Sequence, residues 1–86
     1  MQQSAGIRND YRPITRKLRK EGRSQVWLWR ESKKEGKDWG YETFKNVCNG
    51  WLDHEEIEKW LDEKGYGPEL RLAKAEIAAL KARETE

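Results

Sequence analysis

The sequence predicts a small all-α domain of four to five helices, the last of which carries a short heptad seam. Three observations lead to this fold class. Apolar residues recur at helical spacing, most clearly at Phe44, Val47 and Cys48. Residues that favour helix starts precede such stretches, and glycine follows them. A chain of 86 residues has room for one small core, to which its five tryptophans contribute large apolar areas.

Charge is unevenly distributed along the chain. The net charge is only +2, although 40% of the residues are charged. Residues 1–23 carry seven basic and two acidic side chains, a net charge of +5, whereas residues 51–86 carry six basic and ten acidic side chains, a net charge of −4. This asymmetry predicts one surface that binds a polyanion and another that faces away from it. A basic segment that only keeps the chain in solution is the alternative.

Several classes of protein are excluded by the residues that the sequence lacks. Cys48 is the one cysteine and His54 the one histidine, so neither an intramolecular disulfide nor a tetrahedral Cys/His zinc site can form. We expect Cys48 to lie in the core and His54 to be solvated. No base, nucleophile and orienting group come together, and no phosphate-binding glycine loop occurs, so we expect no enzyme and no cofactor. No apolar run is long enough to span a membrane and no signal-peptide core follows Met1, so we expect a soluble, cytoplasmic protein.

The first 22 residues are expected to form an arm and a helix. Residues 1–9 have no periodicity and form a flexible basic arm that carries Arg8. Asp10 is expected to cap the first helix, Pro13 lies in its first turn, and Gly22 ends it. Its thin apolar stripe consists of Tyr11, Ile14 and Leu18. Its remaining face is basic and carries Arg12, Arg16, Lys17, Arg19 and Lys20.

A second helix is expected over residues 25–35, with Ser24 as its cap. Its buried face would consist of Val26, Leu28 and Trp29. Residues 25–30 are also rich in side chains that favour strands, so a short strand is the alternative there. The break that follows, residues 36–38, together with the end of the helix carries Lys33, Lys34 and Lys37.

Two further helices follow on either side of Gly50. The first covers residues 41–49 and buries the Phe44, Val47 and Cys48 stripe, which leaves Thr43, Lys45, Asn46 and Asn49 off the stripe. The next is expected to be capped by Asp53, with Glu56 completing an acidic capping box, and to end at Gly65. Its buried stripe consists of Ile57, Trp60 and Leu61.

The last helix is expected to begin at Pro68 and to carry a heptad seam of Leu70, Ala73, Ile77 and Leu80. The seam would either pair with a second copy, making a homodimer through a parallel coiled coil, or fold back onto the domain. The expected organisation is therefore a basic arm at residues 1–9, a domain at residues 10–66 and a C-terminal helix at residues 67–86.

The order of these elements resembles the phage-type helix-turn-helix regulators of the Cro/repressor kind. The resemblance covers roughly residues 11–66, and its local motif is Tyr41-Glu42-Thr43-Phe44-Lys45-Asn46-Val47-Cys48-Asn49-Gly50. In that family a short recognition helix keeps two apolar residues three apart, here Phe44 and Val47, and commonly ends in Asn-Gly. The connection at residues 32–39 is longer and more polar than the tight turn of the family. Either the second helix is extended, or the turn has grown into a basic loop.

The resemblance and the charge pattern together predict a sequence-specific transcriptional regulator that binds double-stranded DNA. Residues expected to face the major groove are Tyr41, Glu42, Thr43, Lys45 and Asn46. Glu42 would accept a hydrogen bond from cytosine, and Asn46 would pair with adenine. Phosphates would be bound by Arg12, Arg16, Lys17, Arg19, Lys20, Lys33, Lys34 and Lys37, and Arg8 would reach the minor groove.

The tryptophans support a second hypothesis, in which the chain is a small helical adaptor or inhibitor that binds a protein partner. Trp29 and Trp60 lie on predicted stripes and are expected in the core. Trp27 and Trp39 are less clearly placed, and exposed tryptophan favours either a protein interface or stacking on nucleic-acid bases. RNA binding is a weaker third hypothesis, because the sequence lacks the aromatic strands of the commonest RNA-binding modules.

Overall fold

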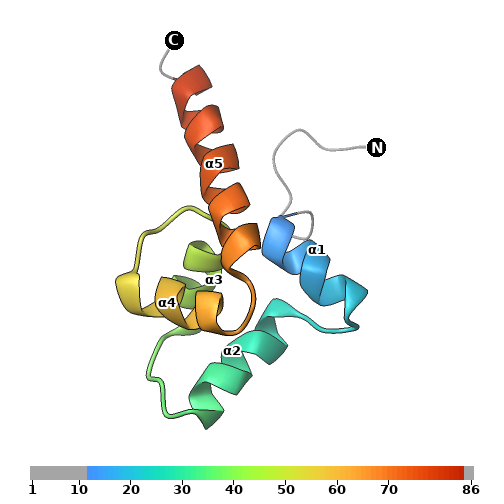
Figure 1. The fold of residues 1–86 in the computed structure, drawn as a ribbon. Helices are drawn as coiled ribbons and strands as arrows, with labels where there is room; N and C mark the ends of the chain where they lie inside the picture. Colours follow the sequence, from blue (N-terminus) through green and yellow to red (C-terminus); the bar gives the residue numbers. More distant parts are fainter. Residues whose placement is uncertain (1–11, 85–86) are drawn as a thin grey trace.

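The computed structural model describes residues 12–84 and contains, within this range, five α-helices and no strand (Figure 1). The helices are α1 (Pro13–Lys20), α2 (Gln25–Lys34), α3 (Tyr41–Cys48), α4 (Glu55–Glu63) and α5 (Gly67–Glu84). The predicted all-α class is therefore confirmed, and residues 25–30 are helical. The predicted arm at residues 1–9 lies outside the described residues.

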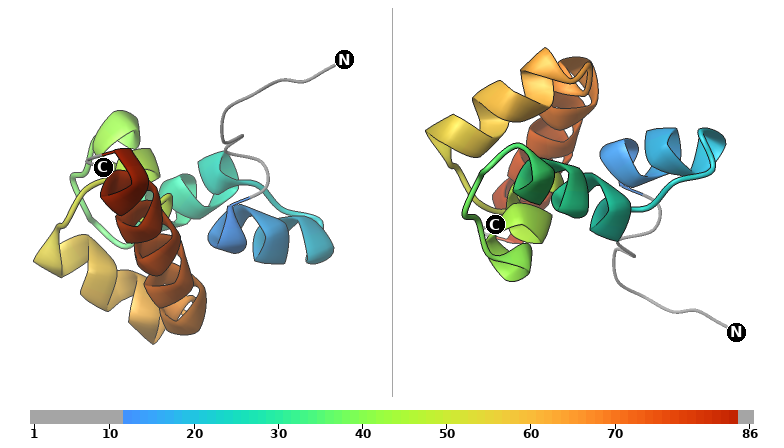
Figure 2. Two further views of the ribbon diagram at one scale, coloured as in Figure 1. Left: turned by 90° about the horizontal axis from the view of Figure 1, so that it is seen from above. Right: turned by 90° about the horizontal axis from the view of Figure 1, so that it is seen from below.

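The five helices pack as one unit. The longest, α5, packs against both α1 and α4, and α3 packs against α2 and against α4 (Figures 1 and 2). The far end of α5 projects beyond the other helices (Figure 1). Because α5 supplies part of the packing of α1 and α4, residues 67–84 belong to the same unit as the helices that precede them.

The core draws on every helix. Its buried side chains are Ile14, Leu18, Leu28, Phe44, Val47, Cys48, Ile57, Trp60, Leu61, Tyr66 and Leu70. The stripes predicted for the helices at residues 41–49 and after Asp53 are therefore confirmed. In α2 the prediction is only partly right, because Leu28 is buried together with Gln25 and Ser32, whereas Val26 and Trp29 are half-buried. Polar Gln25 and Ser32 can take these positions because each has a hydrogen-bond partner there.

A cluster of aromatic rings anchors the long connection between α2 and α3. The ring of Trp39 stacks on Phe44 with centroids 6.4 Å apart and meets Trp60 edge to face at 5.8 Å. The indole nitrogen of Trp29 donates a hydrogen bond of 2.8 Å to the backbone oxygen of Trp39. The connection is thus tied to α2, α3 and α4 despite its length.

Two predicted helix starts need correction. The N-cap of α4 is His54, not Asp53: its Nδ1 accepts a hydrogen bond from the Ile57 amide at 3.3 Å. The Glu58 carboxylate, rather than that of Glu56, accepts from the His54 amide at 2.9 Å. Asp53 is directed instead toward Lys74 of α5, 3.0 Å away. The N-cap of α1 is Arg12, with no side-chain capping bond, and Asp10 lies outside the described residues. The predicted cap Ser24 is confirmed, since its hydroxyl accepts from the Trp27 amide at 3.2 Å.

The heptad seam of α5 folds back onto the domain. Leu70, Ala73 and Ile77 are buried within the chain, and Leu80 is half-buried. A partner helix cannot use side chains that are already covered, so the predicted dimer through this seam is not compatible with the observed packing. Packing of α5 against its own domain therefore explains the heptad spacing of its apolar residues.

The C-terminal end of α3 makes a close contact with the backbone of α5. Gly50 has φ +88°, and a Cβ at this position would lie 2.6 Å from the backbone oxygen of Ala73. Only glycine combines this dihedral angle with so close an approach. The buried guanidinium of Arg12 completes the contact, because its Nη2 donates to the backbone oxygens of Asn49 and Ala73, both at 3.2 Å. Its Nη1 lies 3.0 Å from the Glu76 carboxylate.

A second set of buried hydrogen bonds joins the start of α2 to the end of α3. The side-chain nitrogen of Gln25 donates to the Thr15 hydroxyl and to the Asn49 side-chain oxygen, both at 2.9 Å. Together with the contacts of Arg12, these bonds form a buried polar network, defined here as Arg12, Thr15, Gln25 and Asn49. The network connects α1, α2, the end of α3 and α5.

We expect Arg12→Ala to lower the free energy of unfolding by about 2–4 kcal/mol, since it leaves two buried backbone oxygens without their donor. Urea unfolding followed by circular dichroism measures the change. Arg16→Ala, an exposed position on the same helix, is the matched control and should change stability by less than about 0.5 kcal/mol. Equal losses from the two substitutions would contradict the role of Arg12 in the network.

Candidate nucleic-acid interface

The outer face of α3 carries the side chains that the sequence predicts for the major groove. Glu42 is exposed, and Tyr41, Thr43, Lys45 and Asn46 are half-exposed, while Phe44, Val47 and Cys48 face the core. Asn49 is the exception among the polar residues off the stripe. It is buried and bound to Gln25, so it is part of the network and is not available to a ligand.

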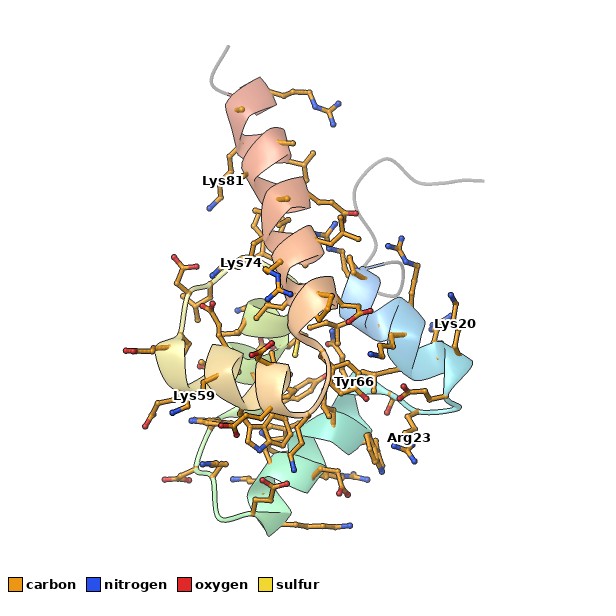
Figure 3. All side chains as sticks on the ribbon, viewed as in Figure 1. Lys20, Arg23, Lys59, Tyr66, Lys74 and Lys81 are labelled. Carbon is orange, nitrogen blue, oxygen red and sulfur yellow. The ribbon has the colours of Figure 1, made fainter. Side chains whose placement is uncertain are left out.

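Beside this face lies a cleft of about 250 Å³ between α1, α2 and α3. Its lining, which we call the basic cleft, consists of Thr15, Arg19, Arg23, Ser24, Gln25, Tyr41 and Lys45. Arg19 comes from α1, Arg23 from the α1–α2 turn and Lys45 from α3, so three cations from separate elements meet in one place. Figure 3 shows Arg23 at the turn between α1 and α2.

The electrostatics of the basic cleft favour an anion. The cleft includes the N-terminal end of α2, where the helix dipole is positive, and the first turn of α2 has no acidic residue. The Arg23 guanidinium lies over the Trp27 ring, 4.2 Å from its centroid. Trp27 is not part of the basic cleft, and Arg23 lines both this cleft and a neighbouring one that contains Trp27. The Lys45 ammonium is 3.3 Å from the Glu42 carboxylate on the neighbouring turn of α3.

Arg23 and Gln25 were not predicted as site residues. Arg23 follows Gly22, at a position that predicts a connection between helices and not a site. The available signal was its charge, which lies within the basic segment at residues 1–23. Gln25 acts indirectly, because its hydrogen bonds join the start of α2 to Thr15 and to the end of α3.

Two predicted phosphate contacts serve the fold instead. Arg12 is buried, and its guanidinium is bound to α3 and α5, so it cannot reach a ligand. The Lys17 ammonium donates a hydrogen bond of 2.7 Å to the Gly65 backbone oxygen and lies 3.6 Å from the Glu69 carboxylate. Both side chains were predicted to be on the surface. The sequence of a basic helix does not show which of its cations will bind groups on neighbouring helices.

The remaining predicted cations are exposed but are not gathered at the cleft. Arg16 and Lys20 line a groove on the α5 side of α1, whereas Arg19 lines the basic cleft. Lys33, Lys34 and Lys37 lie at the opposite end of α2 from the cleft. Lys33 and Lys34 are near Asp38 and Glu31, and Lys37 lies over the Trp39 ring. Arg8 lies outside the described residues.

Four of the five tryptophans pack in or against the core, so they do not form an exposed platform for stacking on bases. Trp39 is packed among other rings, Trp27 is covered on one side by Arg23, and Trp29 and Trp60 contact the core. Trp51, which the sequence analysis did not assign, is the tryptophan most exposed to solvent in the described part of the chain.

The one cysteine and the one histidine of the chain both take part in the fold. Residues 12–84 contain no group of three or more His, Cys, Asp and Glu side chains placed to hold a metal ion. Burial raises the pKa of the Cys48 thiol, which disfavours the nucleophilic thiolate. His54 is half-exposed and caps α4, a role that was not predicted for it. Within the same range, every helix is too short or too polar to cross a bilayer.

In comparisons with known proteins, no family model, no curated protein and no solved structure matches the chain.

The burial of Cys48 can be tested by its reaction with a thiol reagent such as a water-soluble aromatic disulfide. Because the thiol is buried on the inner face of α3, we expect the native protein to react at least about a thousandfold more slowly than the protein in concentrated urea. Absorbance of the released thiolate measures both rates. Similar rates in the two conditions would show that the inner face of α3 is open to solvent.

Proposed function

We propose that this chain is a sequence-specific regulator that binds double-stranded DNA, with α3 in the major groove and the basic cleft on the phosphate backbone. The observation that carries the proposal is the meeting of Arg19, Arg23 and Lys45 beside the exposed face of α3. Such a role implies an intracellular location, where the DNA is.

The size of α3 suits the major groove. An α-helix with its side chains is about 10–12 Å in diameter, which fits the major groove of B-DNA, about 12 Å wide. Glu42 and Asn46 lie one helical turn apart on its outer side, with Lys45 next to them. Carboxylate oxygens accept from cytosine, the asparagine amide pairs with adenine, and the lysine ammonium donates to guanine, so this face has the chemistry to read base edges.

The basic cleft would supply the sequence-independent part of the affinity. Arg19 and Arg23 would each neutralise a phosphate, release the corresponding counterions and give a slope of log affinity against log salt of about −2. The positive end of α2 would add a backbone contact to a phosphate oxygen.

The acidic half of the chain supports a single DNA-binding face. Glu55, Glu56, Asp62 and Glu63 of α4 are exposed, and no residue of α4 lines the basic cleft. A polyanion is repelled by α4 and attracted to the cleft, which favours one orientation of approach.

The alternative function, a helical adaptor that binds another protein, is supported by a different observation. Trp51, Leu52 and Leu72 are large apolar side chains that remain exposed. They lie away from the basic cleft, whose lining is polar and cationic. The cleft and the outer face of α3 therefore favour DNA as the ligand of that surface.

We expect Asn46→Ala to relax the base preference at one position by about ten- to a hundredfold, because a base-edge contact contributes ~1–3 kcal/mol of discrimination. The salt dependence of binding to random duplex should be unchanged, since the substitution removes no charge. Selection from a random duplex pool, followed by affinity measurements at two salt concentrations, gives both quantities. An unchanged preference, or an equal loss on every sequence, would refute the assignment of α3 to the groove.

We expect Arg19→Ala and Arg23→Ala each to reduce the magnitude of the salt slope by about 1, with weaker binding to all duplexes. Lys59→Ala, which removes an exposed cation from α4, is the matched control and should leave the slope unchanged. Fluorescence anisotropy of a labelled duplex measures the slope. If Lys59→Ala has the same effect as the two arginine substitutions, the attraction comes from net charge and not from the cleft.

A further inference from the structure

Three large apolar side chains are exposed in the described part of the chain, and they lie in two places. Leu72 of α5 is 48% exposed, and Trp51 and Leu52, in the connection between α3 and α4, are 45% and 41% exposed. In the views of Figures 1 and 2, α5 lies between α1 and the α3–α4 connection. Leu72 is on the α1 side of α5, where it lines a groove with α1.

The first place is a groove between α1 and α5 of about 290 Å³. Its lining, which we call the basic groove, consists of Pro13, Arg16, Lys17, Lys20, Glu69 and Leu72. The Lys17 ammonium and the Glu69 carboxylate lie 3.6 Å apart, so their charges offset each other. Arg16 and Lys20 form no ion pair with another described residue, so they leave the groove with two unpaired cations beside an exposed leucine. Figure 3 shows Lys20 directed outward from the end of α1.

The second place is the α3–α4 connection and the first turn of α4. We call it the acidic edge and define it as Trp51, Leu52, Asp53, Glu55 and Glu56. Asp53 contacts Lys74, yet its side chain remains largely exposed. Glu55 and Glu56 are exposed, and neither forms an ion pair with another described residue. The acidic edge therefore combines an apolar part, Trp51 and Leu52, with an anionic part, Asp53, Glu55 and Glu56.

We propose that the basic groove of one copy of this chain binds the acidic edge of another copy, so that the chain associates head to tail. Each surface combines exposed apolar area with unpaired charge, and the charges have opposite signs. Contact between the two surfaces would bury Trp51 and Leu52 near Leu72 and bring Glu55 and Glu56 toward Arg16 and Lys20. Within one copy the two surfaces cannot meet, because α5 separates them.

The charges also decide against a dimer in which two like surfaces meet. If the basic groove met a second basic groove, Arg16 and Lys20 would face the same cations, and two acidic edges would face each other in the same unfavourable way. A head-to-tail contact leaves one free groove and one free edge at the ends of every open assembly. Association through it therefore continues beyond two copies unless the rotation closes a ring.

The proposal does not depend on DNA binding, because none of its residues lines the basic cleft or lies on α3. The contact is small, so association is expected at protein concentrations on the order of 0.1 mM and above, and added salt should weaken it.

Two blocked variants test the direction of the contact by sedimentation velocity of the full chain. Leu72→Asp disables the basic groove but keeps the acidic edge, and Leu52→Lys does the reverse. We expect wild-type protein to grow beyond two copies as its concentration rises and each variant alone to stay monomeric. An equimolar mixture of the variants should form a species of two copies and nothing larger, because only one intact groove and one intact edge remain for each pair.

Matched controls keep the net charge of each variant but alter other surfaces. Lys34→Gln has the same change in net charge as Leu72→Asp, and Glu63→Gln has the same change as Leu52→Lys. Both should associate like the wild type. Circular dichroism of all variants should be unchanged, since every substituted side chain is exposed.

Three results would overturn the proposal. Wild-type protein that stays monomeric at every concentration would mean that the two surfaces do not bind each other. Wild-type protein that stops at two copies, with one variant retaining that mass, would indicate a symmetric dimer through a single surface. A mixture of the two variants that stays monomeric while wild type associates would show that other residues carry the contact.

Discussion

The rest of the structure depends on the hydrogen bonds that the buried guanidinium of Arg12 donates. This guanidinium binds the backbone oxygens of Asn49, at the end of α3, and Ala73, within α5, where Gly50 lets the two backbones come close. Gln25 then binds Asn49 from the start of α2. The donors and acceptors of these hydrogen bonds are buried, so a group that loses its partner cannot bond to water instead. Small displacements of α3 are therefore costly. The outer face of α3 and the basic cleft therefore keep a fixed relation to each other.

The basic side chains of α1 and of its N-cap lie at three different places in the structure. Arg12 and Lys17 hold α1 to the end of α3 and to α5, Arg19 lines the basic cleft, and Arg16 with Lys20 lines the basic groove. If the chain binds DNA as proposed, the groove stays uncovered while the cleft is occupied. Head-to-tail contacts between copies on neighbouring sites would then make binding cooperative, since each bound copy offers a surface to the next.

Features that depend on near neighbours in the chain could be predicted from the sequence. Ser24 caps α2, Gly50 follows the end of α3, and the spacing of Phe44, Val47 and Cys48 identifies a buried face. Features decided by distant partners could not. The acceptors of Arg12 lie 37 and 61 residues away, so nothing near Arg12 distinguishes it from the exposed Arg16. The heptad spacing of α5 is the same whether the seam meets a second copy or its own domain. Asp53 was predicted to cap α4, but it contacts Lys74 of α5, a distant partner that the sequence around Asp53 does not reveal, and His54 is the cap.

The central claim is that α3 and the basic cleft form one DNA-binding face. Nitrogen–proton correlation spectra of labelled protein, recorded during titration with a mixed-sequence duplex at low salt, test it most directly. We expect the largest changes at the backbone amides of Arg19, of residues 23–25 and of residues 41–46, and no change in α4. Changes concentrated on α4 or on the far end of α5, or no change around the cleft, would contradict it.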